Sequence, residues 1–182
     1  ALGAVALSGC GGSDPATNDL PAGVTHHGVA TYSATAVGSG ATAATQDLLT
    51  GGIGKSGLGA ATAPAYADPA NPTALELRRN ALYSNYRGIL DPSANGGYGS
   101  LYGPNITAAG VVTTGEGLIP GREYTGTLGD GSGRKRVVMA VQIPDSFDPA
   151  NPCVVVGPSS GSRGVYGAIG TAGEWGLKRG CA

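Results

Sequence analysis

Apolar side chains recur at helical spacing between residues 73 and 91. They stand seven positions apart, at Leu75, Leu82 and Ile89, which places them on one face of a helix. Thr73 precedes Glu76 by three residues, and this spacing is typical of a capping box at a helix N-terminus. Three arginines lie off the apolar stripe and are expected to face elsewhere: Arg78, Arg79 and Arg87. The pattern predicts a helix that begins after Thr73 and ends before Asp91-Pro92.

The next segments with a clear pattern indicate β-strands. Residues 122–128 and 136–143 are rich in β-branched and apolar side chains. Between them, Gly129-Asp130-Gly131-Ser132-Gly133 supplies the glycines that a tight turn needs. We therefore expect an antiparallel hairpin. Farther along, Cys153-Val154-Val155-Val156 is a short apolar run, which is typical of a parallel strand buried on both faces.

A second capping signature follows that apolar run. Thr171 stands three residues before Glu174, and it predicts a helix through Trp175 that Gly180 ends. Cys181 would then begin a further strand. A hairpin followed by strand, helix and strand is the order in which an α/β sheet is built. The predicted fold class is therefore α/β, with an antiparallel hairpin followed by parallel strands.

The first 72 residues show little of either pattern. They carry five charged side chains and two tyrosines, whereas residues 73–182 carry eighteen charged and eight aromatic side chains. Alanine, glycine, threonine and serine dominate this part of the chain. We predict a long irregular leader over residues 11–72, with a short helical turn near Gln46–Leu49. Residues 73–182 are then expected to be the start of a larger, truncated α/β domain.

Composition and charge exclude several classes of protein. Glycine occupies 34 and proline 12 of the 182 positions, which argues against a long coiled coil or a helical repeat array. The formal net charge of −1 gives no electrostatic reason to expect nucleic acid or an anionic membrane as partner. No run of apolar residues is long enough for a transmembrane helix.

The N-terminal ten residues resemble the end of an export signal. The apolar stretch Ala1–Leu7 precedes Ser8-Gly9-Cys10, and Leu7-Ser8-Gly9-Cys10 resembles a bacterial lipobox, in which the cysteine is lipidated. We interpret residues 1–10 as a remnant of a signal peptide or lipobox. The protein is then expected to be secreted or periplasmic, with Cys10 as a candidate membrane tether. The alternative is an apolar N-terminus without such a role.

Gly157-Pro158-Ser159-Ser160-Gly161 fits the G-x-S-x-G pattern of a nucleophile elbow. An elbow passes directly into a helix, but residues 162–170 contain three further glycines and no helical period. A Gly- and Ser-rich loop after an early strand favours an oxyanion loop, whose backbone N–H groups would face developing negative charge. The residues of that loop are Ser159, Ser160, Gly161 and Ser162. An elbow with Ser159 as nucleophile and a plain turn remain alternatives.

No catalytic triad can be completed within these residues. The only histidines, His26 and His27, precede the loop, whereas α/β-hydrolases place the histidine after the serine. Adjacent histidines without nearby acidic residues or cysteines indicate a solvated loop rather than a metal site. Gly52-x-Gly54-x-x-Gly57 matches a dinucleotide fingerprint, but no strand is predicted before it. We therefore predict no metal and no organic cofactor.

The cysteines suggest a disulfide if the protein is exported. Cys10 would be taken by processing, which leaves Cys153 and Cys181 as a pair. Both would stand at the start of neighbouring parallel strands, and strands about 4.8 Å apart lie within the span of a disulfide. The alternative is a pair of buried thiols.

Three stretches carry a resemblance to a known family. They are Leu48–Leu58, Pro120–Tyr124 and, above all, Cys153–Cys181 with its Gly-Pro-Ser-Ser-Gly-Ser-Arg-Gly loop and Glu174-Trp175-Gly176. In these stretches the chain resembles the bacterial D-3-hydroxybutyrate oligomer hydrolases. The resemblance implies a secreted serine esterase of α/β-hydrolase type that cleaves small-molecule hydroxybutyrate oligomers to monomers in polyhydroxybutyrate degradation.

The same resemblance implies that the nucleophile, acid and histidine lie beyond residue 182. These residues alone are therefore expected to be inactive, and the intact protein is expected to be an enzyme. The alternative is a non-catalytic exported lipoprotein or binding module, anchored at Cys10. Sequence beyond Ala182 would separate the two, because a serine elbow followed by Asp and His would favour the esterase.

Overall fold

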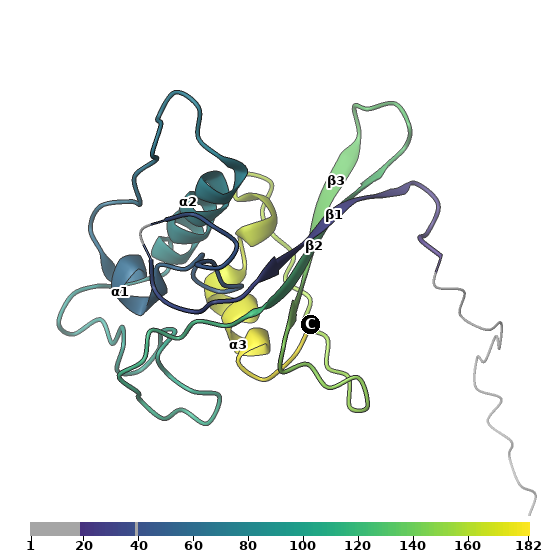
Figure 1. Ribbon diagram of the computed structural model, residues 1–182. Helices are drawn as coiled ribbons and strands as arrows, with labels where there is room; N and C mark the ends of the chain where they lie inside the picture. Colours follow the sequence, from purple (N-terminus) through teal and green to yellow (C-terminus); the bar gives the residue numbers. More distant parts are fainter. Residues whose placement is uncertain (1–18, 39) are drawn as a thin grey trace, which may run out of the picture.

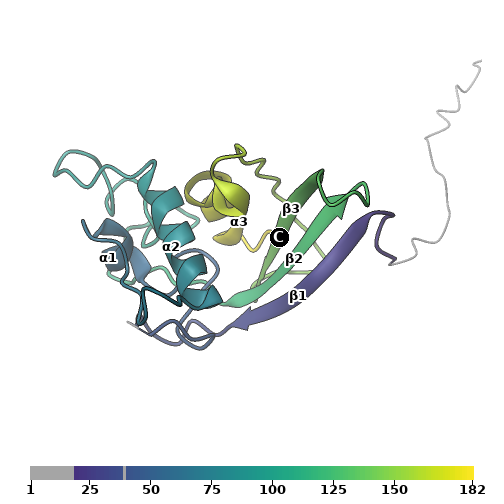
Figure 2. The ribbon, with the colours of Figure 1, turned by 90° about the horizontal axis from the view of Figure 1, so that it is seen from above.

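The computed structural model describes residues 19–38 and 40–182. Three strands, β1 (Val24–Tyr32), β2 (Gly121–Gly129) and β3 (Arg136–Pro144), form an antiparallel sheet of order β1-β2-β3. The helices α1 (Gly54–Gly59), α2 (Ala74–Arg87) and α3 (Glu174–Leu177) gather on one side of this sheet (Figures 1 and 2). A 3₁₀ turn, η1 (Gly164–Tyr166), and a π turn, η2 (Ile169–Gly173), precede α3.

The hairpin prediction is confirmed. β2 pairs with β3 from Gly121, opposite Pro144, to Gly129, opposite Arg136. The glycine-rich turn between them allows the chain to reverse, because glycine adopts positive φ without steric cost. The central strand β2 is therefore paired on both sides, with β1 along its other edge.

The prediction of an irregular leader over residues 11–72 is wrong for the segment that forms β1. This strand pairs with β2 from Val24, opposite Leu128, to Tyr32, opposite Gly121. Its own sequence is only weakly apolar, and most of its side chains are half-buried or exposed. The strand forms because the backbone of β2 offers partners for its N–H and C=O groups. Residues 11–18 of the predicted leader lie outside the described residues.

A second part of the predicted leader contributes to the core. Residues 46–50 are fully buried, and they form a turn rather than the predicted helical turn near Gln46–Leu49, with α1 beginning later at Gly54. The Asp47 carboxylate holds this turn, which we call the Asp47 turn (residues 46–53). It accepts hydrogen bonds from the backbone N–H groups of Leu49, Thr50 and Gly52 and from that of Ile119. Gly52 must be glycine, because its φ is +82° and a Cβ would overlap the Thr45 carbonyl.

The predicted helix is confirmed as α2, with its capping box, but it ends at Arg87, so Ile89 of the predicted apolar stripe lies outside it and is exposed. The Thr73 hydroxyl accepts from the Glu76 N–H, and the Glu76 carboxylate accepts from the Thr73 N–H. The apolar face packs into the core, which includes Leu82, Tyr83 and Tyr86 from α2. Arg78 and Arg79, expected off the apolar stripe, are also buried. They lie between the helix and the Asp47 turn, where backbone and side-chain acceptors surround them.

The predicted strand over residues 153–156 does not form within the described residues, and it is not buried on both faces. Val155 packs against Gly176 of α3, but Val154 is 71 % and Val156 80 % exposed because no described residue covers the opposite side. Residues 153–155 are extended beside the last residue described. Val155 N–H donates to Ala182 O (2.8 Å) and Ala182 N–H to Cys153 O (2.9 Å). These two bonds have the pattern of one step of a parallel ladder.

The second predicted capping box is also wrong. The α-helix begins at Glu174, after the π turn, and its N-cap residue is Gly173. The Thr171 hydroxyl donates to the Ala168 carbonyl instead of capping the helix. The Glu174 carboxylate accepts from the Tyr86 hydroxyl and pairs with Lys178. This buried carboxylate is therefore used for packing α3 against α2. No helix in the described part of the chain is long and apolar enough to cross a bilayer.

Candidate functional site

The Gly-Ser loop, residues 157–163, connects the extended segment 153–156 to η1. Every residue of this loop is exposed. Its backbone turns at residues 160–163, where Arg163 N–H donates to Ser160 O (3.0 Å). Among the hydrogen bonds of the described residues, none uses the backbone N–H groups of 159–162 as donors. The loop therefore presents a short run of N–H donors that other parts of the described chain do not occupy.

The loop is attached to the helices and the sheet just beyond its turn. The Tyr166 hydroxyl donates to the Glu123 carboxylate of β2 (2.7 Å). The Asn85 side-chain amide of α2 donates to the Arg163 carbonyl (3.1 Å). The exposed loop is thus fixed at its C-terminal end by two side chains from different elements.

Glu123 belongs to a buried polar cluster. Arg78 of α2 donates to both carboxylate oxygens of Glu123 (2.9 and 2.8 Å), and Gln142 of β3 donates to one of them (2.9 Å). Arg78 also donates to the Gln46 side chain (2.6 Å), and its guanidinium lies 4.1 Å from the centre of the Tyr32 ring. Such a buried ion pair is tolerated because every charged atom has partners.

The charges of this cluster reinforce one another. Burial alone would raise the pKa of the Glu123 carboxyl, but the hydrogen bonds and charge of Arg78 outweigh it and hold the pKa below its usual value. Burial alone would lower the pKa of Arg78, and Glu123 reverses that effect. Burial raises the pKa of the Tyr166 phenol, which stays protonated and able to donate. Glu123 and Arg78 are therefore charged at neutral pH.

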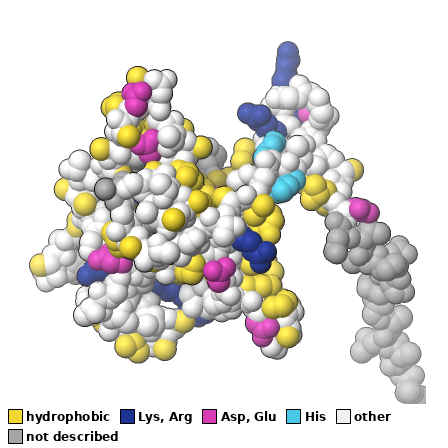
Figure 3. Space-filling model, in the orientation of Figure 1, with side chains coloured by type: hydrophobic (Ala, Val, Ile, Leu, Met, Phe, Trp, Pro, Cys, Tyr) yellow, Lys and Arg dark blue, Asp and Glu magenta, His cyan; other side chains and the backbone are white. Residues whose placement is uncertain are grey.

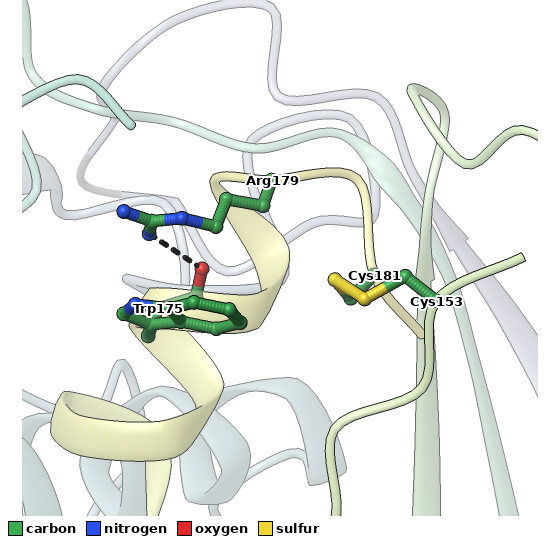
Figure 4. The surroundings of a disulfide bond; sticks show 4 residues. All are labelled: Cys153, Trp175, Arg179 and Cys181. Atoms are coloured by element: carbon green, nitrogen blue, oxygen red, sulfur yellow. Dashed lines mark hydrogen bonds between the residues drawn. A yellow bond between two sulfur atoms is a disulfide. The ribbon is translucent and has the colours of Figure 1, made fainter. Parts of the chain in front are cut away.

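A disulfide joins Cys153 to Cys181, with Cα atoms 4.6 Å apart (Figure 4). It connects the start of the extended segment to Cys181, four positions beyond the end of α3, so the Gly-Ser loop lies within the closed ring. Beside it, the Arg179 guanidinium stacks 4.2 Å from the centre of the half-exposed Trp175 ring. The same arginine donates to the Trp175 carbonyl (3.1 Å). The helix and the loop are thus covalently held together.

The two histidines are not brought to the Gly-Ser loop. His26 and His27 lie in β1 rather than in the predicted loop, and both are exposed (Figure 3). His27 Nε2 is hydrogen-bonded to the Thr127 hydroxyl (2.9 Å). Ser159, the serine of the alternative elbow, donates to the Ser160 carbonyl (3.1 Å). No hydrogen bond within residues 19–38 and 40–182 joins a histidine to this serine. Cys10, the predicted lipidation site, lies outside the described residues.

The nucleotide-like glycine motif has a structural explanation. Gly54 opens the six-residue α1, and the Glu116 carboxylate accepts from both the Ser56 N–H (2.8 Å) and the Ser56 hydroxyl (2.6 Å). A carboxylate of the same chain therefore binds donors that a phosphate would require. In the described ranges, no group of three or more His, Cys, Asp or Glu side chains could hold a metal ion.

The buried cluster was missed from the sequence. Arg78 was expected to point away from the apolar stripe, and Glu123 is a single acidic residue within a strand. Tyr166, the third member of the cluster, follows a glycine-rich stretch with no helical or strand period. Nothing in the local pattern connects these three residues, which are separated by more than 40 positions along the chain. Only the packing of α2 beside β2 could have indicated the contact between Arg78 and Glu123.

Comparison with known proteins places the chain in a family. The family model described as 3HB-oligomer hydrolase (3HBOH) matches residues 4–182. A D-(-)-3-hydroxybutyrate oligomer hydrolase of Polaromonas naphthalenivorans is 57 % identical over 185 residues, which cover 100 % of this chain and 25 % of that protein. One of Burkholderia thailandensis is 64 % identical over 139 residues, 76 % of this chain and 20 % of that protein.

The chain spans about a quarter of the length of the curated relatives that match it throughout. One of these, from Burkholderia mallei, is 54 % identical over 182 residues. No solved structure matches the chain. The family match covers nearly every residue, including the Gly-Ser loop, both cysteines of the disulfide and the polar cluster. The chain belongs to the 3HB-oligomer hydrolase family.

Proposed function

We propose that the intact protein hydrolyses oligomers of D-3-hydroxybutyrate, and that this chain contributes the Gly-Ser loop as its oxyanion-binding element. The substrate class is supported by the family and by the names of the relatives. The role of the loop is supported by one observation above all. Its N–H groups at 159–162 have no acceptor within the described residues, while the loop itself is fixed at its C-terminal end.

The proposed reaction is acyl transfer through a serine. In it, a serine oxygen bonds to the ester carbonyl carbon while its proton passes to a histidine, and the carbonyl oxygen becomes an oxyanion. The ester C–O bond then breaks, and the departing oxygen of one 3-hydroxybutyrate unit takes the proton from the histidine and becomes a hydroxyl. Water repeats both steps on the acyl-enzyme and releases the second product. The serine, acid and histidine belong to the part of the protein outside this chain.

Backbone N–H groups suit the oxyanion better than the serine hydroxyls of the loop. They carry fixed partial positive charge, and an anchored loop needs little reorganisation when negative charge develops. A hydroxyl must instead be rotated and held, and the Ser159 hydroxyl is already bound to a carbonyl of its own loop. The proposal therefore assigns the binding to the main chain.

The proposed setting is an exported protein with an α/β-hydrolase-type sheet. A disulfide between Cys153 and Cys181 is suited to an oxidising compartment. The parallel hydrogen-bond step between residues 153–155 and Ala182 supports continuation of a parallel sheet. We place the enzyme outside the cytoplasm on these grounds, with the tether at Cys10 as part of the proposal.

The loop assignment can be tested with two substitutions at one position of the full-length protein. Gly161 occupies the second position of the turn 160–163, where proline is favoured, and a Cβ there would meet nothing within 4 Å. Gly161→Pro removes one N–H, and Gly161→Ala keeps it. We expect Gly161→Pro to lower kcat for monomer release from hydroxybutyrate trimer by about 10²–10³-fold, with Gly161→Ala near the wild-type value.

Two results would contradict the assignment. Equal activity of both Gly161 variants would show that the N–H is not used. Total loss of activity in Ser159→Ala, comparable to removal of a nucleophile, would favour the elbow over the oxyanion loop. Circular dichroism and thermal unfolding of each variant would establish that the fold is retained.

A further inference from the structure

Every residue of the Gly-Ser loop is exposed. Gly157 lies close to Ala168 and Ser159 to Gly167, and otherwise the position of the loop depends on where its ends are held. Upstream, residues 153–155 are extended and tied to Ala182 and, through the disulfide, to Cys181. Downstream, the chain passes into η1, whose last residue is Tyr166. The ring of Tyr166 is half-buried, and its hydroxyl reaches Glu123 at 2.7 Å. The downstream end is thus held by two hydrogen bonds, one from Tyr166 to Glu123 and one from Asn85 to the Arg163 carbonyl.

The acceptor of that bond is unusually well fixed. Glu123 is 3 % exposed and receives hydrogen bonds from two elements besides η1. Arg78 of α2 binds it in bidentate fashion, and Gln142 comes from the adjacent strand β3. A bidentate guanidinium–carboxylate pair restricts the carboxylate in both distance and plane. The Tyr166 hydroxyl therefore binds an atom whose position is set by the helix and the sheet together.

The ring of Tyr166 is held by the same cluster. The Arg78 guanidinium lies 5.6 Å from its centre and also stacks on Tyr32 from β1. The Tyr166 phenol, whose pKa is raised by burial, is protonated at neutral pH, so it donates to a charged acceptor. Hydrogen bonds of this kind are stronger than neutral ones.

We propose that Tyr166 is a positioning residue for ester hydrolysis, and that its hydrogen bond to the Arg78–Glu123 pair holds the Gly-Ser loop at the distance from which its N–H groups bind the oxyanion. This inference rests on the function proposed above and deepens it. Tyr166 touches neither the substrate nor the reacting atoms in this role. It connects an exposed loop to the rigid core. This connection matters because a donor displaced by about 1 Å loses much of its effect on the transition state.

Tyr166→Phe in the full-length protein tests the proposal, with Tyr83→Phe as matched control. Tyr83 is also a tyrosine with one hydroxyl contact, to the Ala60 carbonyl (2.8 Å), and it lies in the core, with no hydrogen bond to the loop among the described residues. Each substitution removes one oxygen and leaves the ring in place. We expect Tyr166→Phe to lower kcat on hydroxybutyrate trimer roughly 10- to 100-fold, with KM within about twofold. Tyr83→Phe is expected to keep kcat.

A second readout separates positioning from general loss of structure. Butylboronic acid forms a tetrahedral adduct with a reactive serine and places a charged oxygen where the oxyanion would lie. Its inhibition constant should rise in Tyr166→Phe by a factor similar to the fall in kcat, because both report the same site. Tyr83→Phe should leave the inhibition constant unchanged, even where thermal unfolding shows that both variants lose similar stability.

The results for the Gly161, Tyr166 and Tyr83 variants distinguish the positioning role of Tyr166 from the oxyanion-binding role of the loop. If Gly161→Pro lowers kcat and Tyr166→Phe does not, the loop binds the oxyanion but Tyr166 does not position it. If Tyr83→Phe lowers kcat as much as Tyr166→Phe, the effect is one of stability and the inference is overturned. If Gly161→Pro leaves kcat unchanged, the oxyanion function of the loop itself fails.

Discussion

The Asp47 turn and the valine segment 154–156 are opposites in composition and in burial. The turn carries a carboxylate, an amide and a hydroxyl, and yet Gln46, Asp47 and Thr50 are fully buried. The valine segment is wholly apolar, and yet Val154 and Val156 are largely exposed. The turn is buried because every polar group of Asp47 has a donor, whereas the valines lack a surface to pack against among the described residues.

The difference shows what burial requires in this chain. Polar groups can leave water when their hydrogen bonds are replaced, and apolar groups can leave it only when another element covers them. The Asp47 carboxylate accepts most of its hydrogen bonds from the backbone of its own turn and one from Ile119. The valine segment has no such partners among the described residues, and it is tied to the rest of them by the disulfide at Cys153.

Loss of the Asp47 carboxylate is expected to have the largest effect. Asp47→Ala removes the acceptor of several buried N–H groups and leaves them unpaired. We expect a loss of roughly 4 kcal/mol in the free energy of unfolding, measured by urea denaturation of the full-length protein. Asp68→Ala is the control, because Asp68 binds only its own exposed turn. Equal effects of the two substitutions would contradict the assigned role of the turn.

Removal of the disulfide is expected to have the next largest effect. The bridge joins two residues that are 28 positions apart along the chain, and a double Cys153→Ser, Cys181→Ser variant should be about 3 kcal/mol less stable in the same assay. Reduction with dithiothreitol should reproduce this loss in the wild type and leave the variant unchanged. A wild-type protein whose unfolding is insensitive to the reductant would contradict a stabilising role for the bridge.

The smallest expected effect concerns the valine segment itself. If the proposed α/β sheet covers Val154 in the intact protein, Val154→Ala should lower its stability by about 1–2 kcal/mol. Val137→Ala on the edge strand β3, where the side chain is also exposed, provides a comparison at an exposed valine of the described sheet. A change below about 0.5 kcal/mol at Val154 would mean that the segment stays exposed in the whole protein.

The errors in predicting the fold have a common physical origin. The helix α2 and the hairpin were found because their periodicity and turn residues are local. β1 was missed because its sequence, with two histidines and a glycine, shows little alternation, and it is a strand only beside β2. The cap at Thr171 was misread because Glu174 has a stronger use, with Tyr86 and Lys178. A local motif is overruled when a tertiary contact offers its side chain a better partner.

In the candidate site, too, the feature with a local pattern could be predicted and the contacts between distant residues could not. The Gly-Ser loop was located from its sequence, since its glycines and serines stand out after an apolar run. Its anchors were not, because Tyr166, Glu123 and Arg78 meet only when η1, β2 and α2 are assembled. The family resemblance indicated the chemistry but gave no information about what holds the loop.

The sequence by itself determined the capped helix, the hairpin, the position of the Gly-Ser loop and the family. Each of these depends on residues close to one another along the chain, or on a pattern shared with relatives. Tertiary structure alone decided that a polar turn lies in the core, that three valines remain partly in water, and that a buried ion pair supports an exposed loop. These results depend on contacts between distant residues, and the free energy of burying a group is set by the neighbours it meets rather than by its own type.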